Sequence, residues 1–341
     1  MKRILVIKVT SLGDVIQAQP VVADLKRAFP GVVVDWACDE VFADVALWNA
    51  GIDRVHCAPL RRFKKARRWA DFKAIFASIS DLRAHRYDAV MDIHGVYKSA
   101  IIAFLTRSAR RYGYHSKNLG EQGAAFAYTD RFVPRQDVNA WQGMRDTVAD
   151  ALGYRADSPA VYNLRIPQPA QPIVDTGGVP IALLFHATSK DDKKWPTDRW
   201  VAVAKELHQR GFHVALPWGS PSEREEALKI IEQAPQTHLL PQLSVTAIAQ
   251  LIDASALVVG VDTGFAHLAH ALGKRTVMIF TVTSSVHSGN QAPYRSTSIG
   301  GDGVVPTVAE VVEAIGYVHS SPPADGGEVD SPARMESAVR S

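Results

Sequence analysis

The stretch ALVVGVDTGFAHLAHAL, residues 256–272, passes from one structural pattern to another within a few residues. Its first part is almost entirely apolar, which is typical of a buried strand. From Gly264 onward, apolar residues recur at the spacing of a helix. The turn Asp262-Thr263-Gly264 therefore joins a buried strand directly to a helix, which is the repeating unit of α/β proteins.

The same strand-to-helix unit recurs on both sides of this stretch. Other apolar runs that precede helical patterns are RILVIKV (3–9), VVVDWAC (32–38), AVMDIH (89–94), IALLFHAT (181–188) and HVALPWG (213–219). Strands that alternate with helices in this way pair in parallel, and the helices cover both faces of the sheet. The sequence therefore predicts an α/β fold built on parallel sheets.

A connection rich in proline and glycine divides the chain into two halves. The segments PQPAQP and TGGVP both fall within 167–180, which we predict to be a linker between a first domain at 1–166 and a second at 181–318. The remaining residues, 319–341, carry few large apolar side chains, so we expect a disordered tail. Ligands of open α/β sheets bind at the carboxyl ends of strands, so we expect a ligand cleft between the two domains.

Bulk composition limits the classes of protein to which the chain can belong. With 341 residues, 47% of them apolar, it is long enough for two domains with sizeable cores. It has no apolar run long enough to cross a bilayer, no signal-peptide pattern and only two cysteines, Cys38 and Cys57, so we expect a cytoplasmic protein. The net charge of +3 is uneven, because residues 61–69 hold six basic residues in nine. The rest of the chain is nearly neutral and has no nucleic-acid-binding motif, so we expect no nucleic-acid partner.

The turn after Asp262 is a candidate anion site. At the start of a helix, the N–H groups of Thr263 and Gly264 have no partner within the helix, and the helix dipole favours an anion. The alternative is that Asp262 and Thr263 only cap the helix. Two loops at corresponding strand ends, HATSKDDKKWP (186–196) and LPWGSPSE (216–223), favour the anion site. They add hydroxyls and lysines, which suit a diphosphate.

The first strand ends in the turn TSLGD (10–14), which carries one glycine and a carboxylate. The missing Gly-x-Gly-x-x-Gly pattern argues against dinucleotide binding, and so against an oxidoreductase of the Rossmann type. The residues alone leave two roles open for Asp14: a cap of the following helix, or a general base in a group transfer. The two roles conflict, because the helix dipole lowers the pKa of a capping carboxylate and a lower pKa makes a weaker base.

Taken together, these motifs resemble the ADP-heptose:lipopolysaccharide heptosyltransferase family, most closely its inner-core members. The matching segments include KVTSLGDVIQAQP (8–20), YDAVMDIHGVYKSA (87–100), the two loops above and VGVDTGFAHLAHAL (259–272). The resemblance implies the GT-B architecture, with two Rossmann-like domains, the acceptor in the first and the donor in the second. It implies inverting transfer of L-glycero-D-manno-heptose from ADP-heptose to the Kdo of Kdo-lipid A, with no metal and no other cofactor.

The resemblance also assigns residues by position. Asp14 matches the catalytic base, and Lys193 matches a lysine on the donor diphosphate. The residues that match donor contacts are Thr188, Lys193, Glu223, Leu243, Asp262, Thr263, Gly264 and His267. Those assigned to the acceptor side are Ser11, Gly13, Arg61, Arg62, Lys64, Lys65 and Lys98. Because this acceptor is a lipid, we also expect peripheral contact with the cytoplasmic face of the inner membrane; no protein partner is inferred.

Three positions depart from the family pattern. The loop Phe280–Ser285 replaces one that often contains Gly-Pro-Thr, Gln17 stands where a histidine is common, and His94 replaces a glutamine. These departures bear on sugar and acceptor contacts more than on the class of reaction. The alternatives are therefore a related heptosyltransferase with a different acceptor or, in a different class, a nucleotide-binding module without catalytic activity.

Overall fold

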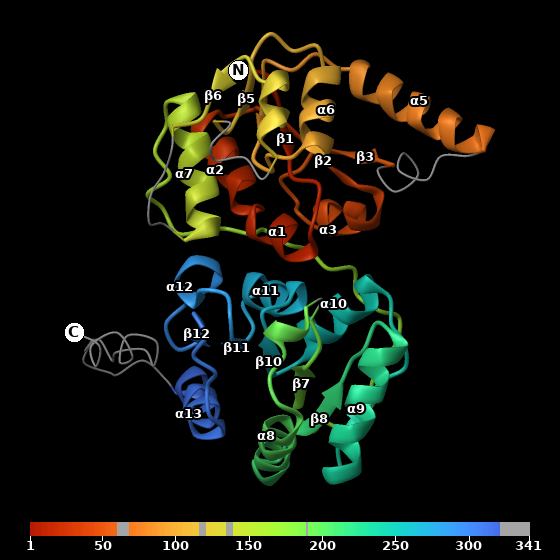
Figure 1. Ribbon diagram of the computed structural model, residues 1–341, viewed down its shortest axis with the longest axis vertical. Helices are drawn as coiled ribbons and strands as arrows, with labels where there is room; N and C mark the ends of the chain where they lie inside the picture. The colour runs from red at the N-terminus through yellow and green to blue at the C-terminus, as the bar shows by residue number, and fades with distance from the viewer. Residues whose placement is uncertain (60–67, 116–120, 134–138, 189, 321–341) are drawn as a thin grey trace. The chain divides into compact units, whose positions relative to one another are not determined.

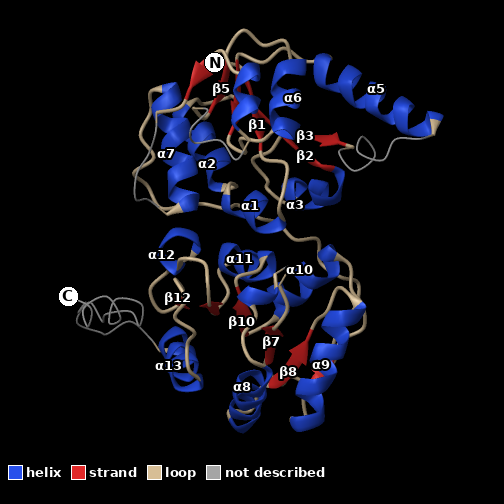
Figure 2. Ribbon diagram, in the orientation of Figure 1, coloured by secondary structure: helices blue, strands red, loops and turns tan. Residues whose placement is uncertain are grey.

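The computed structural model describes residues 1–59, 68–115, 121–133, 139–188 and 190–320. Contacts between residues divide the chain into two compact units, Met1–Arg165 (unit 1) and Ile166–Ser341 (unit 2), coloured from red to blue along the chain in Figure 1. Each unit contains one six-stranded sheet with helices packed against it (Figure 2). The tail predicted at 319–341 lies outside the described residues from 321 onward.

Unit 1 is built around β1, which lies in the middle of its sheet. The strand order is β3-β2-β1-β4-β5-β6, and every pair is parallel. The strands are β1 (Arg3–Ile7), β2 (Val33–Asp39), β3 (Arg54–Ala58), β4 (Ala89–Asp92), β5 (Arg111–Gly113) and β6 (Asp130–Arg131). The helices are α1 (Leu12–Gln17), α2 (Pro20–Ala28), α3 (Ala43–Leu47), α5 (Trp69–Arg83), α6 (Tyr97–Leu105) and α7 (Ala140–Leu152), with the 3-10 turns η1 (Glu40–Phe42) and η3 (Gln122–Ala127).

Unit 2 repeats this plan around β10. Its strand order is β12-β11-β10-β7-β8-β9, again with every pair parallel, so the predicted α/β class is confirmed. The strands are β7 (Ile181–Phe185), β8 (His213–Leu216), β9 (His238–Leu239), β10 (Leu257–Val261), β11 (Thr276–Phe280) and β12 (Ser296–Gly300). The helices are α8 (Thr197–Gln209), α9 (Pro221–Gln233), α10 (Val245–Ala254), α11 (Gly264–Ala271), α12 (Ser285–Ser288) and α13 (Val308–His319), with the 3-10 turn η4 (Asp191–Lys193). In the described part of the chain, no helix is both long enough and apolar enough to cross a membrane.

The structure differs from the sequence prediction in two respects. The helical pattern after β1 continues to Phe29, but the chain forms two helices, and the second begins at Pro20. Proline lacks an N–H group, so it starts a helix more readily than it continues one. Strands β5, β6 and β12 were not predicted, because β5 and β6 are only three and two residues long and β12 reads STSIG.

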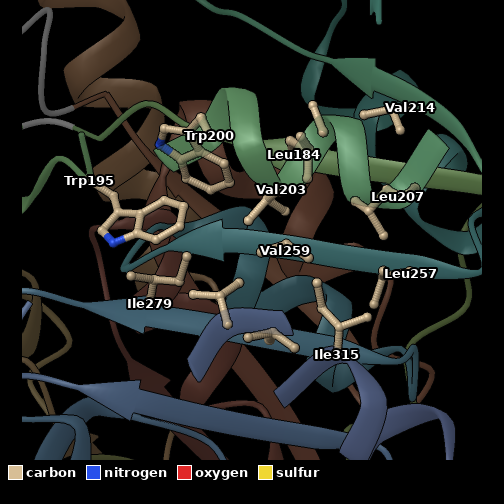
Figure 3. Packing of buried hydrophobic residues seen from close by; sticks show 14 of the residues in the cluster. Leu184, Trp195, Trp200, Val203, Leu207, Val214, Leu257, Val259, Ile279 and Ile315 are labelled. Carbon is tan, nitrogen blue, oxygen red and sulfur yellow. The ribbon is translucent and has the colours of Figure 1, made fainter. Parts of the chain in front are cut away.

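The core of unit 2 anchors the loop 186–196. Trp195 is buried and packs edge to face on Trp200 of α8, with ring centroids 5.1 Å apart (Figure 3). The indole N–H of Trp195 donates to the carbonyl oxygen of Pro306 at 2.8 Å. Lys193 lies two residues before this anchor, so packing in the core fixes the backbone from which its side chain extends.

Unit 1 contains a buried ion pair that joins α7 to α2. Arg145 and Asp24 are each only 2% exposed. The guanidinium donates from Nε to Asp24 Oδ2 at 2.7 Å and from Nη2 to Oδ1 at 3.0 Å, so the pair is bidentate. The same guanidinium donates to the Ser158 carbonyl at 2.6 Å and to Gln142 Oε1 at 2.9 Å. The Arg145 side chain thus holds α2, α7 and the segment after α7 together.

Candidate functional site

In each unit, titratable residues lie where the strand order reverses. In unit 1 the order reverses between β1 and β4, and Asp14 follows β1 while His94 follows β4. In unit 2 it reverses between β10 and β7, and Asp262 follows β10 while Lys193 follows β7. Such reversal points are the usual ligand sites of open α/β sheets.

Asp262 is the centre of a polar cluster in unit 2. Its Oδ2 accepts hydrogen bonds from Lys193 Nζ at 2.6 Å and from the Thr283 hydroxyl at 2.9 Å. Its Oδ1 lies 3.5 Å from Nε2 of His267. Burial raises the pKa of Asp262, but the hydrogen bonds from His267 and Lys193 outweigh it and hold the pKa well below the ordinary value. The carboxylate is therefore ionised over the whole physiological pH range.

His267 is oriented by a second buried side chain. Its Nδ1 lies 2.7 Å from Nδ2 of Asn290, which is almost fully buried. This contact with a buried amide holds the ring of His267 so that its Nε2 faces Asp262.

The loop Phe280–Ser285 contributes directly to this cluster. Thr283 donates to the Asp262 carboxylate, as described above. Thr281 donates from its hydroxyl to the carbonyl oxygen of Asp192 at 3.0 Å, which links the same loop to η4. Thr281 and Thr283 therefore support the two segments that carry Lys193 and Asp262.

A cavity of about 330 Å³ lies beside the cluster. Thr188, a cavity residue, donates from its hydroxyl to the Asp262 carbonyl at 3.2 Å and so connects the two. Four of the predicted donor residues line the cavity: Thr188, Glu223, Leu243 and Thr263. Most of the remaining lining is apolar or aromatic and consists of Phe185, Ala187, Pro217, Trp218, Gly219, Val245, Ile248 and Phe265. Apolar walls with a few polar groups suit a planar base attached to a polar sugar.

Glu223 is held rigidly in the wall of this cavity. Its Oε2 accepts the backbone N–H of Gly219 at 2.7 Å and that of Ser220 at 3.3 Å, while the Glu223 N–H donates to the Ser220 hydroxyl at 3.3 Å. This reciprocal arrangement is a capping box at the start of α9. Trp218 is fixed nearby, because its indole N–H donates to the Leu240 carbonyl at 2.7 Å.

In unit 1, Asp14 is the third residue of α1 and not its cap, so the interpretation of Asp14 as an N-cap residue is wrong. The cap is Ser11, and Asp14 Oδ2 accepts from both the N–H and the hydroxyl of Ser11 at 2.8 Å. Lys8 Nζ lies 3.3 Å from Asp14 Oδ1. Burial raises the pKa of Asp14, but the Lys8 charge and the bonds from Ser11 outweigh it and keep the pKa below the ordinary value.

His94 and Lys98 belong to the same electrostatic neighbourhood. Burial, with the positive charges of Lys8 and Lys98, lowers the pKa of His94 to about 4, against the opposing charge of Asp14. His94 is therefore neutral at pH 7. Lys98 is exposed at the start of α6, and Gly13 is buried within α1.

We predict that Lys8→Met moves the acid limb of the kcat/KM profile to higher pH. Burial raises the pKa of Asp14, and the Lys8 ammonium opposes that effect. Without the ammonium the pKa of Asp14 rises, so the carboxylate becomes protonated at a higher pH. The measurement is a pH–rate profile of the variant beside Lys26→Met, in which the lost lysine pairs with Asp53 instead. The Lys26→Met profile should match that of the wild type. An unmoved acid limb in Lys8→Met would show that Lys8 does not set this titration.

Some predicted residues are not placed by the structure. Arg61, Arg62, Lys64 and Lys65 lie outside the described residues.

Gly264 begins α11 with Thr263 at its N-cap position. Within the described ranges, no group of three or more His, Cys, Asp or Glu side chains is arranged to hold a metal ion.

The sequence interpretation missed several side chains of the site. Phe185 and Phe265 stack with ring centroids 5.3 Å apart and both line the cavity. Each lies at a quoted motif, one at the last position of β7 and the other just after the Asp-Thr-Gly turn, so the spacing carried a signal. Thr283 and Asn290 carried none, because their partners are more than twenty residues away.

Comparisons with known proteins show the family to which the chain belongs. Residues 75–300 match glycosyltransferase family 9 (heptosyltransferase). Lipopolysaccharide heptosyltransferase 1 of Escherichia coli K12 is 32% identical over 284 residues, which cover 82% of this chain and 88% of that protein. Structures of the E. coli heptosyltransferase WaaC with ADP and with ADP-2-deoxy-2-fluoro heptose superpose with TM-scores of 0.80 and 0.77, at 28% identity over 92% of this chain and 99% of theirs. The chain therefore belongs to glycosyltransferase family 9, the heptosyltransferases, and has their GT-B type of fold.

Proposed function

We propose that the protein transfers L-glycero-D-manno-heptose from ADP-heptose to the Kdo of Kdo-lipid A, with inversion at the anomeric carbon. The observation that carries the proposal is the cavity of unit 2 beside the ionised Asp262–Lys193 pair. The E. coli relative that binds an ADP-heptose analogue supports the choice of donor. Because the acceptor is a lipid, this activity also implies that the protein contacts the cytoplasmic face of the inner membrane peripherally.

The cavity fits the adenosine part of the donor. Phe185, Phe265 and Leu243 offer apolar surface to a purine, and Glu223 offers a carboxylate to ribose hydroxyls. The diphosphate then lies toward Thr188, Thr263 and the first N–H groups of α11. Binding of the nucleotide half of the donor thus uses groups that the fold already holds in place.

Lys193 stabilises the leaving group. As the bond between the anomeric carbon and the phosphate oxygen breaks, the electron pair stays on ADP, and the Lys193 ammonium offsets the charge that develops there. Asp262 keeps this ammonium in position through the 2.6 Å contact. Thr283 donates to the same oxygen, Oδ2, and His267 lies against the other oxygen, Oδ1, so both help to keep Asp262 in place.

Asp14 removes the proton from the acceptor hydroxyl. The hydroxyl oxygen forms the new bond to the anomeric carbon, and its proton passes to the Asp14 carboxylate as the bond to ADP breaks. Ser11 and Lys8 fix the carboxylate so that it requires no reorganisation during the step. Lys98 and the basic residues between 61 and 65 are proposed to attract the acidic acceptor.

The test is to incubate the protein with ADP-heptose and Kdo-lipid A and to examine the lipid by mass spectrometry. We expect a product heavier by one heptosyl residue, formed together with free ADP. In a parallel thermal-shift measurement, ADP should raise the melting temperature and NAD should not, because only a ligand of the native state stabilises it. A shift with ADP but no product on Kdo-lipid A, with product on an acceptor that already carries one heptose, would identify a related heptosyltransferase. A shift without product on either acceptor would indicate a nucleotide-binding module.

A further inference from the structure

The exposed aromatic side chains of the described residues are gathered on three neighbouring elements of unit 1. α5, α6 and η3 together carry all six: Trp69, Phe72, Phe76, Tyr97, Phe104 and Phe126. Monomeric proteins seldom expose clustered large apolar side chains without a functional reason. We propose that this face, called the aromatic surface below, inserts into the headgroup region of an anionic lipid bilayer.

The spacing of these residues places them in one stripe on each helix. On α5, Trp69, Phe72 and Phe76 are three and four residues apart. On α6, Tyr97 and Phe104 lie two turns apart, with half-exposed Ile101 between them. Residues at this spacing share one face of a helix. Each helix thus packs with one face and leaves an apolar stripe in solvent, with Trp69 80% and Phe76 66% exposed.

The elements that carry these stripes are neighbours in unit 1. α5 contacts α6, and Nε of Arg83 in α5 donates to the Leu105 carbonyl at the end of α6 at 3.1 Å. α6 in turn packs on η3, where the ring of Phe104 lies 5.8 Å from that of Phe126. In Figure 1, α5 and α6 lie beside each other within unit 1. A bilayer can therefore meet several aromatic rings at once.

The charges around the aromatic surface favour anionic lipid over a neutral or acidic partner. The segments 68–111 and 121–131, which span α5, α6 and η3, contain nine basic and six acidic residues. Two of the acidic residues add little negative charge to the surface, because Asp92 is fully buried and Asp81 pairs with Arg54 and His56. The basic residues of these segments are Arg68, Lys73, Arg83, Arg86, Lys98, Arg107, Arg110, Arg111 and Arg131. Aromatic rings flanked by arginine and lysine suit the interface of an anionic bilayer, where rings sit among the headgroups and cations meet phosphates.

This inference rests on the proposed function only in its choice of partner, since a Kdo-lipid A acceptor resides in a membrane. The binding test therefore uses vesicles that contain no acceptor. Sucrose-loaded vesicles of phosphatidylethanolamine and phosphatidylglycerol are sedimented with the full chain, beside vesicles of phosphatidylcholine alone. We expect binding to the anionic vesicles, weaker binding to the neutral ones, and a loss of binding as salt is raised.

The decisive variant is Trp69→Ser/Phe76→Ser. Both side chains are highly exposed, so the change should leave folding and the ADP thermal shift intact while lowering the vesicle partition coefficient at least about tenfold. The matched control is Leu47→Ser/Val161→Ser, which removes two exposed apolar side chains elsewhere in unit 1 and should bind like the wild type. Equal binding by the wild type and the Trp69→Ser/Phe76→Ser variant would overturn the proposal. So would a dimer, seen by sedimentation velocity, that this variant dissociates, because the surface would then join two copies of the chain.

An activity measurement separates this inference from the proposed function. Transfer to a Kdo acceptor without acyl chains should be the same in the wild type and in Trp69→Ser/Phe76→Ser, whereas transfer to Kdo-lipid A in vesicles should fall in the variant. Vesicle binding without any transfer would remove the proposed function and leave the aromatic surface as a membrane site. Transfer without vesicle binding would overturn the membrane role of the aromatic surface and leave the proposed function in place.

Discussion

Asp14→Asn is expected to lower kcat at least about a hundredfold. A positioned general base contributes roughly 10²- to 10⁴-fold, and the amide cannot take up the proton of the acceptor hydroxyl. The amide oxygen can still accept from the N–H and hydroxyl of Ser11, so the start of α1 should remain intact. The measurement is single-turnover transfer to Kdo-lipid A with saturating donor.

The control for this variant is ADP affinity. The cavity lies in unit 2 and Asp14 in unit 1, so the ADP thermal shift of Asp14→Asn should equal that of the wild type. More than about a hundredth of the wild-type rate would exclude Asp14 as the base, because the remaining effect would be smaller than general-base catalysis supplies. Ser11→Ala is a useful companion, since it removes one of the bonds to the carboxylate but keeps the charge.

Arg145→Met is expected to destabilise unit 1 by about 3–5 kcal/mol. Removing one partner of a buried ion pair leaves the other charge without compensation, and Asp24 is as deeply buried as Arg145. Arg27 also reaches Asp24, but at 3.5 Å and from a half-exposed position, so it is a weaker partner. Native-state hydrogen exchange followed by mass spectrometry measures the effect, with faster exchange expected in the peptides of α2 and α7.

The peptides of unit 2 provide the internal control for Arg145→Met, because neither member of the pair touches that unit's core. Adding Asp24→Asn to Arg145→Met removes the uncompensated charge and should recover part of the stability. If Arg145→Met alone lowers the free energy of unfolding by less than about 1 kcal/mol, then the buried pair contributes no more to stability than an exposed ion pair does.

Much of the fold was predictable because its signals are local. Ser244 and Thr307 each stand just before a helical pattern in the sequence, and both are N-cap residues whose hydroxyls accept a backbone N–H. Gly153 stands at the end of such a pattern and ends α7 with a φ of 74°, which glycine adopts without strain. β12 escaped prediction because its burial comes from pairing with β11, and a strand of small and hydroxyl side chains has no apolar pattern of its own.

The site was predictable to the extent that single motifs carry it. The turns around Asp14 and Asp262 can each be recognised within a dozen residues. The contacts of Asp262 were not predictable, because Lys193 and Thr283 reach it from 69 and 21 residues away, whereas Asp14 contacts Ser11 and Lys8 of its own motif. The aromatic stripe on α5 was also hidden, since the same helical pattern would serve for packing against a core.

The hydrogen bonds on Asp262 have a consequence for inhibitor design. A compound that offers its own cation to Asp262 competes with Lys193, Thr283 and His267, which already occupy the carboxylate, and so gains little. Between the stacked rings of Phe185 and Phe265 and the indole of Trp218, the walls offer apolar area instead. The affinity of an inhibitor thus comes from apolar contacts in the cavity and not from a charge directed at Asp262.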